Sequence, residues 1–181
     1  MRRITTGAVL MLSTFAVPVV AQEHGQHAEA PSEGLRAELI QDVQQLQEKY
    51  VGLAQAMTGK FDWRPGDGVR SVGEVFGHIA NANFMIPSMA GAERGMADRN
   101  FEQETDESAI VEGLEHSFTH AVHSIASIPD SELDAKVTMF GREATKRQVL
   151  TLLVTHMHEH LGQAIAYART NDVTPPWSGA E

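Results

Sequence analysis

Four segments of the chain repeat apolar residues at steps of three and four, and this repeat constrains the fold more than any other feature. Such spacing places the apolar side chains on one face of an α-helix. The expected helices cover residues from about 32–57, 71–87, 107–128 and 145–169. Each helix must bury its apolar stripe against the others, so the sequence predicts an all-α fold, a four-helix bundle.

Residues at the helix starts and between the helices refine this prediction. Ser71 with Glu74, and Thr145 with Gln148, have the form of capping boxes, which satisfy free amide hydrogens at a helix start. The connections between helices are roughly 15 residues long, more than a simple up-and-down bundle needs, which indicates long crossover connections. Residues 137–141 within the last connection are expected to form a short extended piece.

The chain divides into a leader, a tail and one folded domain. Residues 1–21 begin with Arg2 and Arg3, continue with an apolar stretch and end in small residues, which is typical of a secretory signal peptide. The route, general secretory or twin-arginine, stays open. Residues 22–31 read as a flexible tail, and residues 32–177 as the domain. We therefore expect an exported protein, periplasmic or secreted, with no membrane span once the signal is cleaved.

Composition removes several classes of function. The chain has no cysteine, which excludes disulfides, thiolate zinc sites and thiol nucleophiles supplied by the protein. Its formal net charge of -10 argues against a nucleic-acid partner. Nine histidines remain as the unusual feature, and their positions decide which chemistry is available.

Helical angles separate the histidines by face. His116, His120 and His123 lie together on the third helix, opposite its apolar stripe, and are interpreted as a solvated face. His156 and His160 lie four residues apart on the fourth helix and border its apolar face. Two imidazoles at this spacing can bind one metal ion from a single helical turn.

Further polar side chains share these edges. His78 borders the buried stripe of the second helix, and Gln163 and Tyr167 follow the histidine pair along the fourth, whereas His158 points elsewhere. A third imidazole from a neighbouring helix would complete a three-histidine set. Three such ligands leave a coordination position open, which is typical of a catalytic rather than a structural site.

Several stretches of the chain together resemble a known family. Residues 61–65 and 71–78, residues 155–163, and residues 167–169 with 174–176 resemble the family segments W-x-P … S-[IV]-G-E-[IL]-x-x-H, H-x-x-x-H-x-G-Q and Y-x-R … P-P. On these motifs the chain resembles the DinB-like superfamily of metal-binding four-helix bundles, named from damage-inducible genes. The resemblance covers nearly all of the chain after its leader.

The resemblance implies that His78, His156 and His160 are metal ligands, with Gln163 and Tyr167 as supporting residues. It implies a divalent metal, zinc or nickel, and a homodimer. Some relatives use the metal to activate a low-molecular-weight thiol in transferase or isomerase reactions. The implied partner is therefore a small-molecule substrate or thiol, and the implied enzyme a metal-dependent transferase or hydrolase that activates water or a substrate thiol.

Two features set this chain apart from many relatives. Glu159 and Leu161 stand where those relatives carry a histidine and an arginine, and the export signal contrasts with thiol cofactors that are mainly cytoplasmic. Two alternatives therefore stay open: a non-catalytic exported metal-binding or stress-related protein, and a helical domain with vestigial ligands. An open cleft over the three histidines would distinguish an enzyme from both.

Overall fold

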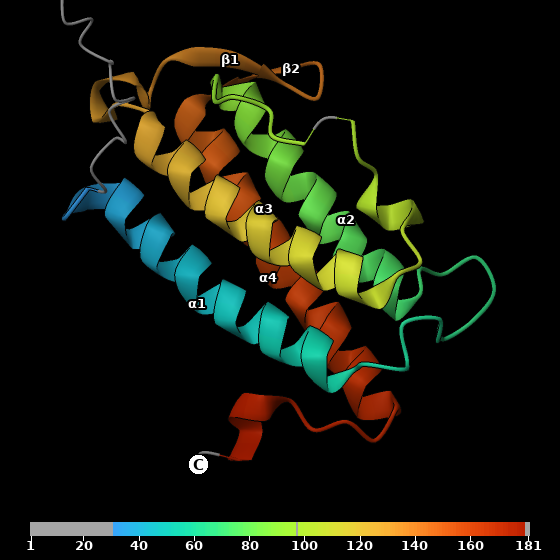
Figure 1. The fold of residues 1–181 in the computed structure, drawn as a ribbon. Coiled ribbons are helices and arrows are strands. Elements are labelled where there is room, and N and C mark those ends of the chain that lie inside the picture. The colour runs from blue at the N-terminus through green and yellow to red at the C-terminus, as the bar shows by residue number, and fades with distance from the viewer. Residues whose placement is uncertain (1–30, 97, 180–181) are drawn as a thin grey trace, which may run out of the picture.

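The computed structural model describes residues 31–96 and 98–179. The predicted signal peptide and residues 22–30 of the predicted tail lie outside the described residues. The fold is mostly helical, and its four long helices confirm the four segments expected from the apolar repeat (Figure 1). These helices are α1 (Gly34–Ala56), α2 (Val72–Met85), α3 (Glu107–Ser127) and α4 (Lys146–Thr170).

Both predicted capping boxes are confirmed. The Ser71 hydroxyl accepts a hydrogen bond from the backbone N–H of Glu74 at 3.2 Å, and the Glu74 carboxylate accepts one from the backbone N–H of Ser71 at 2.6 Å. Thr145 and Gln148 exchange the same pair of bonds at 3.3 and 2.8 Å. The boxes fix where α2 and α4 begin, and therefore which residues reach each face of these helices.

The helices pack in an order that differs from their order in the chain. α1 and α2 each pack mainly against α3 and α4. Figure 1 shows α2 and α3 running in the same direction, so the segment between them returns along the outside of α2. Short 3-10 helices lie in the connections, namely η1 (Ile86–Ala90), η2 (Phe101–Gln103) and η3 (Asp130–Glu132), and a further one, η4 (Pro176–Gly179), follows α4. Of these, η2 packs closely on α2.

A small hairpin precedes α4. Strands β1 (Lys136–Met139) and β2 (Arg142–Thr145) pair antiparallel, so the extended piece expected at residues 137–141 is one half of a hairpin. Phe140 and Gly141 form its two-residue turn with φ values of 48° and 77°. Left-handed backbone at both turn residues matches the twist of the flanking strands, and it leaves the Phe140 side chain exposed at the tip.

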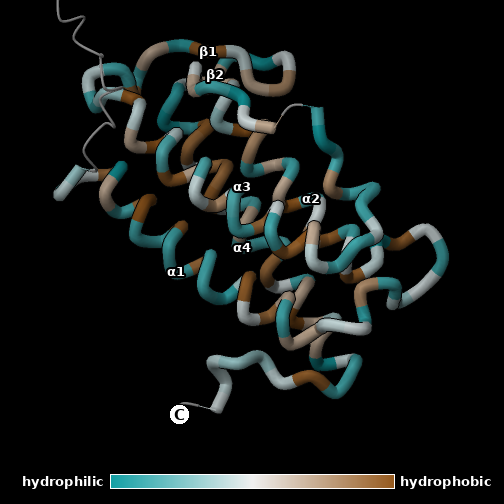
Figure 2. The backbone as a smooth tube through the Cα atoms, in the orientation of Figure 1, coloured by the Kyte–Doolittle hydropathy of each residue, from teal (hydrophilic) through white to brown (hydrophobic). Residues whose placement is uncertain are grey.

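The core lies between the four helices and is mostly aliphatic. Figure 2 shows hydrophobic and hydrophilic stretches alternating along α1, as expected for a helix with one buried face. Two hydrogen bonds join buried polar side chains of the core to neighbouring helices. The hydroxyl of Tyr50 donates to the carbonyl of Met157 at 2.6 Å, and Asn83 donates to Ser117 at 3.1 Å. Among the described residues, no helix has the length and apolar character needed to cross a membrane.

Candidate metal centre

The structure brings the three sequence-predicted ligands together. His78 comes from α2, and His156 and His160 come from adjacent turns of α4. One ring nitrogen from each lies within 4.8 Å of the others, and the ring centroids are 4.5 to 5.1 Å apart. In the described part of the chain this is the one group of three or more histidine and acidic side chains with such spacing.

The position of η2 depends on two glycines. A Cβ on Gly77 would collide with the backbone of Phe101 and Glu102, and a Cβ on Gly113 would collide with the ring of Phe101. Phe101, which is fully buried, is thus wedged between α2 and α3 where neither helix has a side chain. This close approach places the next residue, Glu102, beside His78.

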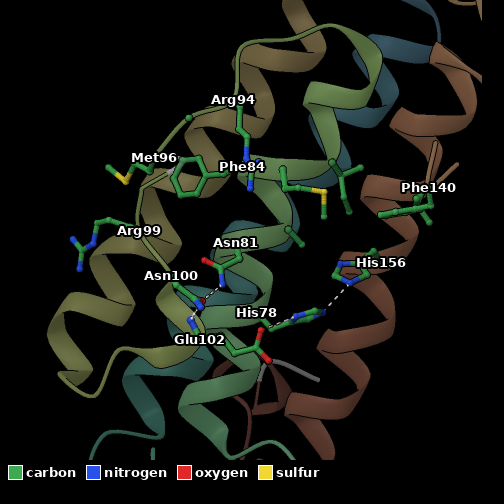
Figure 3. A pocket seen from close by; sticks show the side chains of 15 residues that line it. His78, Asn81, Phe84, Arg94, Met96, Arg99, Asn100, Glu102, Phe140 and His156 are labelled. Carbon is green, nitrogen blue, oxygen red and sulfur yellow. Dashed lines mark hydrogen bonds and ion pairs between the residues drawn. The ribbon is translucent and has the colours of Figure 1, made fainter. Parts of the chain in front are cut away.

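Glu102 orients the His78 ring. Its carboxylate lies 3.3 Å from Nδ1 of His78 and accepts a hydrogen bond from Nε of Arg70 at 2.5 Å. A carboxylate only accepts, so Nδ1 of His78 must carry the proton. In the neutral ring Nε2 is then left with a free lone pair, and this atom lies 3.2 Å from Nε2 of His156 (Figure 3).

Gln163 has the same effect on His160. The side-chain oxygen of Gln163 lies 2.8 Å from Nδ1 of His160, and its amide nitrogen donates to the hydroxyl of Tyr167 at 2.9 Å. Tyr167 is buried, and its ring meets the edge of Trp63. The two residues predicted to support the ligands are therefore linked to His160 in one chain of hydrogen bonds. A hydrogen bond of this kind fixes the tautomer and the ring orientation of a ligating histidine.

His156 completes the cluster and has the least ordinary environment. Its Nε2 lies 3.2 Å from Nε2 of His78, and its buried Nδ1 has no partner among the described residues. Burial, together with smaller contributions from the neighbouring His160, His78 and Arg70, lowers the pKa of His156 from 6.5 to about 4. Burial also lowers the pKa of His78, with Arg70 and His160 contributing. Both rings are neutral at pH 7, the form that binds a metal.

The donor set suits a divalent metal ion. Two imidazole nitrogens that each lie about 2.0–2.1 Å from one zinc ion are about 3.3 Å apart in a tetrahedron. The 3.2 Å between Nε2 of His78 and Nε2 of His156 is close to that separation. Hydrogen bonding leaves one buried atom of the cluster, Nδ1 of His156, without a partner among the described residues. We conclude that the residues present fit a metal site, and that no donor in the cluster identifies the metal.

The remaining histidines on the helices are outside this cluster. His116, His123 and His158 are exposed, and His158 pairs with Asp42. His120 differs from the solvated position that the helical angles indicated. It is partly buried, contacts Phe84, and lies 3.2 Å from the hydroxyl of Ser124. The return segment covers it, which helical angles alone do not reveal.

Two residues of the site were not found from the sequence. Glu102 lies in a polar connection without periodicity, and Arg70 lies in a loop rich in proline and glycine. The one available signal was Gly77, a glycine inside a helical pattern immediately before a candidate ligand. Such a glycine indicates the close approach of another backbone, although it does not say which segment approaches.

Comparisons with known proteins identify the family and support the fold. The family model of the DinB superfamily matches residues 41–164. A DinB-like protein from Bacillus cereus has a similar structure, with a TM-score of 0.68, 22% identity, and coverage of 76% of this chain and 93% of the other. A DinB-like protein from Bacillus subtilis gives a TM-score of 0.62 and 19% identity at the same coverage. No curated protein matches the sequence. The family match includes all three histidines, and this chain belongs to the DinB superfamily.

Proposed function

We propose that the protein is a divalent-metal enzyme of the DinB superfamily, with His78, His156 and His160 as ligands. The observation that carries the proposal is the convergence of three imidazoles from two helices. A divalent ion held by three histidines keeps a position for water or a thiol and lowers the pKa of that group. The reaction class is a thiol-dependent transfer or a hydrolysis. Since the chain has no cysteine, any thiol must come from a substrate.

Side chains around the three histidines orient the ligands. Glu102 and Gln163 each accept a hydrogen bond from the Nδ1–H group of one ligand, so that Nε2 of His78 and of His160 faces the centre. Arg70 neutralises Glu102 and holds it in place. Tyr167 holds the amide of Gln163. These hydrogen bonds keep the rings of His78 and His160 oriented before any ligand arrives, which reduces the entropy lost on binding.

A pocket beside the cluster favours the enzyme over the two alternatives, a metal-storage or stress-related protein and a domain with vestigial ligands. Its volume is about 600 Å³, and His78 and His156 form part of its wall (Figure 3). This volume lies within the range of small-molecule sites, about 300–1,000 Å³. A storage site needs no such space next to its ligands.

The remaining expectations belong to the same proposal. We infer zinc or nickel as the metal, export by the leader at residues 1–21, and a homodimer. We also infer that the fold is a four-helix bundle with long crossover connections. The parallel course of α2 and α3, and the long segment that joins them, support this topology.

Zinc titration of the purified protein, followed by calorimetry, tests the proposal. We expect about one tight ion per chain, and loss of that binding in His156→Ala and in His160→Ala. His158→Ala is the matched control, because His158 lies between the two on α4 but is exposed. Unchanged tight binding in both ligand variants would refute the assignment. Transferase assays with and without glutathione-like thiols then separate the thiol-dependent reaction from hydrolysis.

A further inference from the structure

The pocket beside the three histidines has a composition of its own. It lies between α2, the segment that follows η1, the hairpin tip and α4. Its inner wall is apolar and includes Phe84, Met85, Ile86 and Leu152. We therefore expect a ligand of this pocket to contact most of the wall with an apolar part.

The rim of the pocket is apolar as well. Three large hydrophobic side chains are exposed among the described residues, namely Val69, Met96 and Phe140, and the last two line this pocket. Phe140 is 64% exposed at the hairpin tip. Exposed apolar side chains that gather around one concavity mark a binding site more often than isolated ones do. They extend the apolar surface from the pocket floor to its opening.

The charge of the pocket is opposite to that of the protein. The chain has a formal net charge of -10, yet the pocket is lined by Arg94 and Arg99 and by a single acid, Glu102. Glu102 is already paired with Arg70, and Arg99 is paired with Glu104.

Arg94 is the arginine of this pocket whose charge is not paired by any residue that the structure describes. Among the described residues it has neither an ion pair nor a side-chain hydrogen bond, and Figure 3 shows its side chain directed into the pocket. The nearby acids Glu93 and Asp98 do not line the pocket. A second pocket on the other side of Glu102 contains Arg64 and Arg70, but both are paired with carboxylates.

Arg94 is held in place by its neighbour. A Cβ on Gly95 would lie 2.8 Å from the ring of Phe84 and 2.9 Å from Nδ1 of His120. The backbone at Gly95 therefore rests directly on these two rings, and the residues on either side of it, Arg94 and Met96, are fixed at the pocket. The cation and the apolar rim thus belong to one anchored segment.

We propose that this pocket binds an amphipathic organic anion. Its apolar body packs between Phe84 and Phe140, and its carboxylate or sulfonate pairs with Arg94. Because His78 and His156 form the adjacent wall, the other end of the molecule faces the three-histidine site. That the anion is the substrate of this site rests on the proposed function, whereas its binding does not.

Two fluorescent probes with the same apolar body test the proposal. 1-Anilinonaphthalene-8-sulfonate carries the anion, and N-phenyl-1-naphthylamine lacks it. Each is titrated into the metal-free and the zinc-loaded protein. We expect Arg94→Gln to weaken binding of the sulfonate about tenfold, as expected for loss of one charged contact, and to leave the neutral probe unchanged. Phe140→Ser should weaken both probes.

Arg142→Gln is the matched control, because Arg142 is exposed on the same hairpin as Phe140 but does not line the pocket. It should change neither probe, and circular dichroism should show the same helicity for all variants. The proposal is overturned if Arg94→Gln leaves sulfonate binding unchanged or weakens the neutral probe equally. If zinc fails to bind while the probes still discriminate, the proposed function fails and anion binding stands. If zinc binds and the probes do not discriminate, only this inference fails.

Discussion

The backbone carbonyl of Phe101 occupies the space beside Gly77 that a Cβ would fill on any other residue. This contact fixes η2 against α2 one residue before the ligand His78. It therefore determines where Glu102 lies, and through Glu102 which nitrogen of His78 carries the proton. Gly77, which has no side chain, thus shapes the candidate metal centre.

Gly77→Ala should destabilise the protein and weaken metal binding together. The added methyl group meets backbone atoms, which cannot move aside as a flexible side chain can, so we expect a loss of about 2 kcal/mol in the free energy of unfolding. Gly162→Ala is the control, since a Cβ there meets nothing within 4 Å. It should raise stability by up to about 1 kcal/mol, the ordinary effect of alanine in a helix. Urea unfolding and zinc titration measure the two effects, and equal stability of both variants would contradict the prediction.

Glu102→Gln should reduce zinc affinity without abolishing it. The amide is nearly isosteric but removes the negative charge that supports the Nδ1 proton of His78. Loss of such a partner typically costs about 10- to 100-fold in metal affinity. Glu159→Gln serves as the matched control, because Glu159 is an exposed carboxylate beside His160 in sequence. Competition against a chelator of known affinity measures the change, and an affinity equal to that of the control would count against a role for Glu102.

Gln163→Leu should weaken zinc binding through His160. The substitution removes the acceptor of the His160 Nδ1 proton while keeping a side chain of similar size. Tyr167→Phe removes only the next hydrogen bond along the chain, so its effect should be smaller. We expect the zinc affinity to fall in the order wild type, Tyr167→Phe, Gln163→Leu. The reverse order would show that Tyr167 rather than Gln163 orients the ligand.

The metal-free protein should lose stability as the pH falls from 6.5 toward 4. The pKa of His156 is lowered from 6.5 to about 4, and burial also lowers the pKa values of His78 and His120. Below pH 6.5 the unfolded chain therefore binds protons that the folded chain does not, which favours unfolding until the folded pKa is reached. Above pH 6.5 this contribution is constant.

Urea unfolding at several pH values after treatment with a chelator checks this dependence. His156→Gln should flatten the fall between pH 6.5 and 4, while His116→Gln, a substitution of an exposed histidine, should leave it unchanged. Carboxylates such as Glu74, whose pKa is lowered from 4.5 by its capping hydrogen bond, contribute only at the lower end of this window and below it. If the free energy of unfolding falls equally with pH in the wild type, in His156→Gln and in His116→Gln, His156 is not the source of the fall.

Much of the fold could be predicted because its determinants are local. Apolar spacing along one helix, a serine followed three residues later by a glutamate, and histidines at positions 156 and 160 all act within a few turns. These patterns gave the helices, both capping boxes and the histidine pair. His120 shows the limit of this approach. Its helical angle indicated solvent, but a segment from elsewhere in the chain covers it.

By itself, the sequence determined four amphipathic helices, their starts, the family motifs and the set of histidines at the edges of apolar stripes. Only the tertiary structure decided that His78 meets His156, 78 residues away, that Glu102 supports it, and that Arg94 faces the pocket next to it. The physical reason is that helix formation depends on neighbours in the chain. Contacts between helices depend instead on how all the apolar faces are buried at once, and on where glycines let one backbone approach another.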